Sequence, residues 1–320
     1  MNTDIHRLGY YPGCALEASA RDYSLAIQRV FQEIGVTLEP VKDWNCCGAS
    51  AAHSTNHKLS LALPYRNLAL AKAQGVTELF APCPFCSKTL MAANAECGMQ
   101  NAELKTPHSE FRIPNSDYDG SVKIINSVDI FHRLFDKIQP KINPERLKGL
   151  KIACYYGCLL VRPPKLVKYD DPEQPTSMDE IAKKVGAEPV DWEFKIECCG
   201  GGFTICNEPA VLELSNKILE DAKENGAQAI IVACQMCQIN LDMRQRAIEK
   251  KYKVKYQMPI IYLPQLIGLA MGIPPEELGL DLHFVSTESI VRRDSGIMRP
   301  EETQDPPDRQ AGAERKTHNA

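Results

Sequence analysis

The cysteines carry most of the chemistry that this sequence can perform. The chain has 13 of them among 320 residues, and ten follow a spacing pattern that occurs twice. A Gly-Cys pair is followed after 31 residues by Cys-Cys-Gly and after 34 more by Cys-x-x-Cys, and in the second occurrence the intervals are 39 and 33 residues. The first cysteine set is Cys14, Cys46, Cys47, Cys83 and Cys86, and the second cysteine set is Cys158, Cys198, Cys199, Cys234 and Cys237.

The number of thiols in each set limits which kinds of metal site are possible. A chain of this length without an export signal needs no disulfide framework, which favours metal ligation or redox chemistry. Zinc takes four ligands and so does a cubane iron–sulfur cluster, whereas each set offers five. Two adjacent cysteines cannot easily ligate the same tetrahedral ion. They can bind two different irons of a cluster, or one of them can bridge two irons. Either one thiol per set is spare or the cluster needs more ligands than a cubane, and the same surplus in both sets favours the second interpretation.

A glycine follows each double cysteine. Gly48 and Gly200 lack side chains and would let the backbone approach inorganic sulfide closely, so we count them as cofactor-binding residues. Gly200 begins a run of three glycines, 200–202. Our hypothesis is that the extra space along this run admits a substrate.

The sequence around the cysteines is also repeated. Residues 11–14 (YPGC) match 155–158 (YYGC), and residues 67–86 parallel 216–237. The segment EPVKDW precedes the first double cysteine, and EPVDW precedes the second. A duplication explains these coincidences better than chance.

Helical and strand patterns alternate within each half. Apolar spacing predicts helices that end at a glycine, over residues 20–34, 59–74 and 210–225. Short apolar runs predict buried strands over residues 76–81, 150–155 and 229–233. Each Cys-x-x-Cys then lies between a strand and a helix, the helices covering residues 87–95 and 238–251. A helix N-terminus favours thiolates, and strands that alternate with helices favour a parallel sheet.

We therefore expect an α/β fold of two tandem, pseudo-symmetric domains with short parallel sheets flanked by helices. The expected domains are residues 1–147 and 148–290, each with one cysteine set, followed by a disordered tail at 291–320. Residues 103–121 are expected to form an extended insertion and residues 162–178 a loop.

The overall composition excludes several classes of function. A net charge of −4 gives no basic excess for binding a phosphate backbone. No run approaches the ~20 apolar residues of a membrane helix, and the first residues lack the apolar core of a signal peptide. We expect a cytoplasmic protein.

The complete pattern, Cys-x31-CCG-x34-CPFC followed by Cys-x39-CCG-x33-CxxC, resembles the CCG-domain family, and specifically the B subunit of heterodisulfide reductase. Residues 263–273 (LPQLIGLAMGI) and 278–283 (LGLDLH) resemble the C-terminal segment of that protein. The resemblance extends over roughly residues 7–292, and the doubled CCG pattern is highly specific.

The resemblance implies a cofactor content and an activity. Each cysteine set would hold one noncubane 4Fe-4S cluster through all five of its thiols, and the two clusters would face each other across the domain boundary. A disulfide, CoM-S-S-CoB or a related heterodisulfide, would be cleaved between them. Tyr155 replaces a histidine of the methanogen enzymes, so another disulfide, a persulfide or a thiol carrier is an alternative substrate.

The resemblance also implies partners. The iron–sulfur C subunit of heterodisulfide reductase would deliver electrons one at a time, and the flavin-containing A subunit, which is capable of electron bifurcation, would supply them. A hydrogenase or formate dehydrogenase module is a further candidate partner.

Two other functions compete with this interpretation. One is a CCG-domain protein that transfers electrons within a lactate, glycolate or succinate oxidoreductase, although such a relay needs no matched pair of substrate-facing clusters. The other is a zinc-stabilised scaffold or thiol redox sensor. We expect the remaining cysteines, Cys97, Cys154 and Cys206, to be small buried packing residues.

Overall fold

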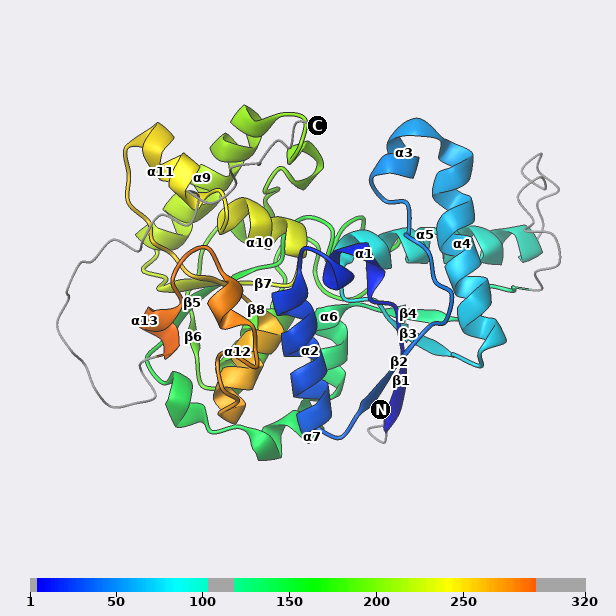
Figure 1. Ribbon diagram of the computed structural model, residues 1–320, viewed down its shortest axis with the longest axis horizontal. Helices are drawn as coiled ribbons and strands as arrows, with labels where there is room; N and C mark the ends of the chain where they lie inside the picture. The colour runs from blue at the N-terminus through cyan, green and yellow to red at the C-terminus, as the bar shows by residue number, and fades with distance from the viewer. Residues whose placement is uncertain (1–4, 103–117, 292–320) are drawn as a thin grey trace, which may run out of the picture.

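The computed structural model describes residues 5–102 and 118–291, arranged as two parallel sheets flanked by helices (Figure 1). The strand order is β2-β1-β3-β4 in the first sheet and β6-β5-β7-β8 in the second, so the two halves repeat one topology. The predicted α/β fold is therefore confirmed. Most of the predicted insertion at 103–121 and all of the predicted tail except Val291 lie outside the described residues.

Every strand pairs in parallel with its neighbours, as in the register Leu8↔Leu38 and Ile230↔Ile260. Helices cover these sheets, and the strands other than the exposed edge strands β2 and β6 are accordingly short, mostly buried runs rather than alternating patterns. The strands are β1 (Arg7–Tyr10), β2 (Thr37–Pro40), β3 (Glu78–Phe80), β4 (Lys123–Ile125), β5 (Lys151–Tyr155), β6 (Glu188–Pro189), β7 (Ala229–Val232) and β8 (Ile260–Tyr262).

The helices of the first half precede β5 and those of the second half follow it. The α-helices are α1 (Gly13–Glu17), α2 (Arg21–Glu33), α3 (Ala51–Thr55), α4 (His57–Ala73), α5 (Pro84–Ala102), α6 (Ser127–Arg133), α7 (Phe135–Ile138), α8 (Ser177–Lys184), α9 (Glu208–Glu224), α10 (Gln235–Leu241), α11 (Gln245–Tyr252), α12 (Leu263–Met271) and α13 (Glu288–Val291). Short 3-10 turns are η2 (Gln139–Lys141), η3 (Pro144–Leu147), η4 (Phe194–Ile196), η5 (Gly201–Phe203) and η6 (Leu280–Leu282).

The predicted elements agree with this structure in most places. The three glycine-terminated helices correspond to α2, α4 and α9, and the three apolar runs correspond to β3, β5 and β7. The helix predicted over 238–251 is wrong as one continuous element, because the chain turns at residues 242–244 between α10 and α11. None of the helices within the described ranges is both long and apolar enough to cross a lipid bilayer.

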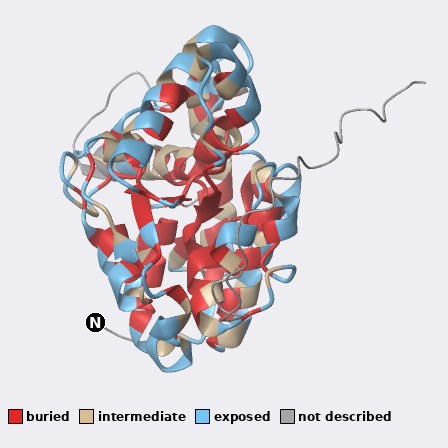
Figure 2. Ribbon diagram, turned by 90° about the vertical axis from the view of Figure 1, so that its left-hand side faces the viewer, coloured by how far each residue is buried: buried red, intermediate tan, exposed pale blue. Residues whose placement is uncertain are grey.

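The two halves are joined through α2 and α12, which lie side by side at the centre of the molecule (Figure 1). Tyr23 of α2 stacks on Tyr262 at the end of β8, with ring centroids 4.1 Å apart and both side chains fully buried. Buried residues of both sheets belong to one apolar core, visible as the red interior of Figure 2. The division at residues 147 and 148 stays a prediction, since the halves share this core.

A buried carboxylate ties the C-terminal segment to the second half. Asp242, at the end of α10, is 1% exposed and accepts hydrogen bonds from the backbone N–H groups of Phe284 (2.8 Å) and Val285 (2.9 Å). Gln238 Nε2 donates a third bond to it at 2.9 Å. Burial, opposed by these bonds, raises the pKa of Asp242 from 3.8 to about 7. The folded chain therefore holds this proton more tightly than the unfolded chain.

This linkage predicts a pH dependence of folding stability. The stabilisation that Asp242 contributes is complete below about pH 4 and is lost as the pH rises through about 7. In the wild-type protein the free energy of unfolding should therefore fall by on the order of 4 kcal/mol between about pH 4 and pH 7. We expect this fall to be absent in Asp242→Asn. Urea unfolding at several pH values measures it. Asp281→Asn, at an exposed carboxylate, is the control, and an unchanged slope in Asp242→Asn would contradict the assignment.

Candidate metal centre

The parallel sheets bring the cysteines of each set to one edge. Cys14 and Cys83 follow the neighbouring strands β1 and β3, and Cys158 and Cys234 follow β5 and β7. Cys234 is the N-cap residue of α10. The carboxyl ends of neighbouring parallel strands meet at one edge, which is the usual ligand-binding edge of such sheets. The predicted position of each Cys-x-x-Cys between a strand and a helix is confirmed.

The first cysteine set converges within the first half. Cys47 Sγ lies 3.3 Å from Cys86 Sγ, and Cys46 Sγ lies 4.0 Å from Cys14 Sγ. The backbone N–H of Cys86 points to Cys83 Sγ at 3.4 Å. These contacts bring together thiols from three segments that are far apart in the sequence.

The second cysteine set repeats this arrangement. Cys199 Sγ lies 3.6 Å from Cys237 Sγ, the counterpart of the Cys47–Cys86 contact. Cys158 forms a side-chain hydrogen bond with Cys198, as Cys14 does with Cys46. All five members of the second set line a single cavity of about 40 Å³, together with Pro84, Phe85, Tyr156, Leu159, Gly201 and Gly202.

The sulfur separations fit ligation of metal by thiolates. Two thiolates bound to one tetrahedral ion at 2.3 Å lie about 3.8 Å apart. The Sγ–Sγ distances of 3.3, 3.6 and 4.0 Å lie on either side of this value. Across residues 5–102 and 118–291, no three or more His, Cys, Asp or Glu side chains already surround one point as the ligands of a single metal ion. The structure thus presents close thiol pairs in each set rather than one closed four-ligand site.

Hydrogen bonds between thiols favour the thiolate form in both halves. Bonds from Cys46 and Cys86 lower the pKa of Cys47 to about 4 despite its burial. A bond from Cys158 lowers the pKa of Cys198 to about 6. Their partners shift the other way, since donating this bond raises the pKa of Cys46 and Cys158. Each set therefore holds thiolate charge near neutral pH, and thiolate is the form that ligates metal.

Each repeat contains a tyrosine that fixes the backbone ahead of the double cysteine. Tyr11 Oη donates to the carbonyl of Asn45 at 2.7 Å, and Tyr155 Oη donates to the carbonyl of Glu197 at 2.5 Å. Asn45 and Glu197 immediately precede Cys46 and Cys198. The repeated tyrosine in YPGC and YYGC was visible in the sequence, but its partner was not. Tyr155 thus has a structural role in holding the residue before Cys198.

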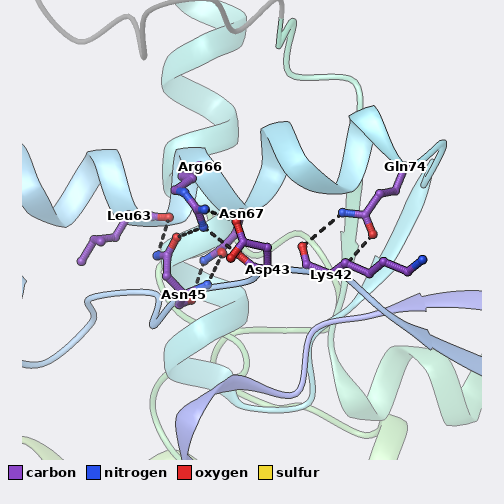
Figure 3. Close-up of polar contacts among 7 residues, drawn as sticks. All are labelled: Lys42, Asp43, Asn45, Leu63, Arg66, Asn67 and Gln74. Carbon is purple, nitrogen blue, oxygen red and sulfur yellow. Dashed lines mark hydrogen bonds and ion pairs between the residues drawn. The ribbon is translucent and has the colours of Figure 1, made fainter.

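A polar network fixes the same segment of the first half (Figure 3). The backbone N–H of Asn45 donates to Asn67 Oδ1 at 2.9 Å, and Asn67 Nδ2 donates back to the Asn45 carbonyl at 2.8 Å. Arg66 donates to Asn45 Oδ1 at 2.9 Å and also binds Asp43. Asn67 is fully buried, so its amide is committed to this loop. The network holds the backbone of the residue before Cys46 against α4.

Four glycines adopt left-handed backbone beside the thiols. Gly48 and Gly200 have φ of +76° and +79°, and their N–H groups point to Cys46 Sγ at 3.5 Å and Cys198 Sγ at 3.3 Å. Gly13 and Gly157, which sequence reasoning did not single out, have φ of +70° and +62°. A Cβ at Gly157 would lie 3.2 Å from Cys237 Sγ, and one at Gly13 would lie 3.0 Å from Cys86 Sγ. The repeated Gly-Cys pair was the signal that could have found them.

The three cysteines outside the pattern differ in burial. Cys97 and Cys154 are buried, which agrees with a packing role. The packing interpretation is wrong for Cys206, which is exposed on the segment after η5. That segment also carries Ile205, whose side chain lies in solvent.

The two cysteine sets contact one another through their Cys-x-x-Cys segments. Gln235 Nε2 lies 2.7 Å from Cys83 Sγ, although the two residues belong to different halves. Phe85 of the first segment lies on the wall of the cavity lined by the second set. A Cβ at Gly201 would lie 3.5 Å from its ring. Nothing in the local sequence pattern indicated this contact between halves.

Residues 8–91 and 152–242 each match the family "CCG: Cysteine-rich domain", and the chain belongs to this family. It is 30% identical over 281 residues to the 8-methylmenaquinol:fumarate reductase membrane anchor subunit of Wolinella succinogenes, covering 88% of this chain and 98% of that protein. It is 28% identical over 290 residues to the B subunit of the ferredoxin/F(420)H(2)-dependent CoB-CoM heterodisulfide reductase of Methanosarcina acetivorans, covering 87% of this chain and 94% of that protein.

A solved structure shares the fold. The crystal structure of a hypothetical protein from Helicobacter pylori superposes with a TM-score of 0.65 at 14% sequence identity. The match covers 88% of this chain and 52% of that chain, so this chain spans about half of the solved protein. A similarity at this level of identity supports the fold alone.

The left-handed glycines generate a prediction about metal content. We expect Gly157→Ala to lower the iron bound by the second cysteine set, because the new Cβ would crowd Cys237 Sγ in a backbone conformation that costs alanine about 1–2 kcal/mol. Gly226→Ala is the matched control, with φ of +76° and no atom within 4 Å of the new Cβ. Iron and acid-labile sulfide after anaerobic purification are the measurement. Equal losses in both variants would show that the crowding is irrelevant.

Proposed function

We propose that this chain is the catalytic, disulfide-reducing component of a heterodisulfide reductase-type complex. The observation that carries the proposal is the contact between the two halves at the cysteine sets, in which Gln235 reaches Cys83 and Phe85 lines the cavity of the second set. Two matched thiol sets that face each other can act on the two sulfurs of one disulfide. The relatives named as the B subunit of heterodisulfide reductase support the same activity.

The ten patterned cysteines would hold two noncubane 4Fe-4S clusters. The first would use Cys14, Cys46, Cys47, Cys83 and Cys86, and the second would use Cys158, Cys198, Cys199, Cys234 and Cys237. The close thiol pairs and the convergence of all five second-set residues on one cavity support five-thiol ligation. Iron–sulfur clusters supply single electrons and iron sites with affinity for sulfur.

The residues around the cavity would orient the substrate and exclude water. Phe85 and Leu159 give the cavity an apolar wall next to Tyr156. Tyr156 Oη donates to Asp179 at 2.7 Å and accepts the N–H of Met178 at 2.7 Å, so its ring is held in one orientation. Reductive cleavage consumes two electrons and two protons, as R–S–S–R′ + 2e⁻ + 2H⁺ gives RSH and R′SH. The role of this chain is to hold the S–S bond in position while the electrons and protons are delivered.

The substrate and the partners follow from the same proposal. CoM-S-S-CoB or a related heterodisulfide is the proposed substrate. The proposed partners are the iron–sulfur C subunit and the flavin-containing A subunit of such a complex, together with a hydrogenase or formate dehydrogenase module. Relatives named as one lettered component of a reductase support a complex of several chains.

One finding favours a second candidate function. The relative from Wolinella succinogenes is named as the membrane anchor subunit of a quinol:fumarate reductase, and its 30% identity extends over 98% of its length. In this alternative the two sets would pass electrons between a quinol-linked partner and a dicarboxylate oxidoreductase. The chain would then release no thiol product.

Loss of one ligand tests the cofactor content. We expect Cys199→Ala to lower iron and acid-labile sulfide to about half, because only the second set loses a ligand. The spectrum of the first cluster should remain and disulfide turnover should stop. Cys206→Ser, at an exposed cysteine outside both sets, should retain full iron and activity. Zinc without sulfide in the wild-type protein would support a zinc scaffold or thiol sensor and defeat the proposal.

A turnover assay separates the two candidate functions. The anaerobic protein, reduced by a one-electron viologen dye, is given CoM-S-S-CoB or simple alkyl heterodisulfides. We expect dye oxidation with two electrons consumed and two thiols formed per disulfide. The same protein should not oxidise the dye with fumarate alone. Full cluster content without thiol release from any disulfide would favour the electron-transfer role.

A further inference from the structure

Gln235 links the two cysteine sets by a direct contact. It is the first residue of α10, lies between Cys234 and Cys237, and is 3% exposed. Its Nε2 lies 2.7 Å from Cys83 Sγ, 152 positions away in the other half. A side-chain amide nitrogen is a hydrogen-bond donor only, so Gln235 donates and the Cys83 sulfur accepts. The second Cys-x-x-Cys segment thus provides a hydrogen bond to a ligand of the first set.

The contact has no counterpart in the opposite direction. The residue that corresponds to Gln235 in the first Cys-x-x-Cys segment is Pro84, which has neither an amide side chain nor a backbone N–H. In the second set, Asn240 Nδ2 approaches Cys199 Sγ at 3.6 Å, but Asn240 belongs to the same half and donates at 3.0 Å to the Cys199 carbonyl. Within the described part of the chain, the contact between halves therefore distinguishes the first set from the second.

The other end of the Gln235 side chain argues against a role in packing alone. Gln235 Oε1 is buried and has no hydrogen-bond partner among the described residues. An unsatisfied buried acceptor costs about 1–3 kcal/mol, which a methionine of similar size would not incur. A glutamine at this position therefore needs a compensating role, and the bond to Cys83 Sγ is the contact that its amide makes.

The physical effect of that bond depends on charge. A hydrogen bond to a sulfur ligand stabilises negative charge on it, and the stabilisation grows when the bound group gains an electron. Both partners are buried, where a hydrogen bond to a charged group is stronger than in water. The added electron is therefore held more firmly on the set that receives the bond.

We propose that Gln235 is a positioning residue that raises the reduction potential of the group bound by the first cysteine set, by donating its side-chain amide to Cys83 across the contact between the halves. This inference rests on the proposed function only in that the ten cysteines hold redox-active clusters. The proposal gives the two cysteine sets different roles. The first set retains an electron more readily, while the second set lines the cavity next to Tyr156.

The test is an anaerobic redox titration of the full chain with its clusters, followed by electron paramagnetic resonance. Gln235→Met removes the donor and keeps the side-chain volume, so one of the two transitions should move to a more negative potential while the other stays in place. Gln238→Met is the matched control, because Gln238 is a buried glutamine on the same helix whose amide binds Asp242 rather than a sulfur. Neither transition should move in that variant.

A second pair of variants assigns the moved transition. With Cys199→Ala removing the second cluster, the remaining transition should still move on Gln235→Met. Gln235→Glu places a carboxylate beside Cys83, and at a pH where it is ionised the shift should be larger and of the same sign. Unchanged reduction potentials in Gln235→Met would overturn the inference. Loss of iron from the first set in the same variant would also overturn it, because Gln235 would then be needed for cluster binding. The titration needs no disulfide, so a wild-type protein that turns over no disulfide would defeat the proposed function and leave this result standing.

Discussion

Convergence of thiols from distant segments is the constraint on which this structure depends. A thiolate binds metal only where its sulfur reaches a common point with the others, and each set draws on three segments separated by more than 30 residues. The parallel sheet meets this requirement, because neighbouring strands end at one edge and place Cys14 beside Cys83, and Cys158 beside Cys234. Glycine backbone and tyrosine hydroxyls then bring the double cysteines to the same edge.

The duplication makes the two sets alike, and a few substitutions make them different. Both halves have the same strand order, the same tyrosine-to-carbonyl bond and the same N–H contact to the first sulfur of the double cysteine. Pro84 and Gln235 occupy corresponding positions, but only Gln235 can donate a hydrogen bond to the facing half. Gly201 and Gly202 line the cavity of the second set, at positions where the first half has Ala49 and Ser50 after its glycine.

Local patterns in the sequence predicted the local features. The family resemblance predicted that the two sets face each other, but no pattern identified the side chains that join the halves. Cysteine spacing, glycine-terminated helices and apolar strands depend on neighbouring residues, so the α/β fold and the position of each Cys-x-x-Cys could be inferred. The stacking of Tyr23 on Tyr262 and the bond from Gln235 to Cys83 join residues more than 150 positions apart and leave no periodic trace. At the break after α10, Asp242 binds the backbone of Phe284, 42 residues further along the same half, and this contact too leaves no local pattern.

The packing of α2 against α12 has a consequence for how the protein matures. As the ribosome releases the chain from its N-terminus, α2 emerges early, whereas Leu263–Met271 emerges only after both cysteine sets have been synthesised. Until then Tyr23 lacks the ring that it stacks on, and the core common to both sheets stays open on one side. The interior common to both halves can therefore close only when the chain is nearly complete.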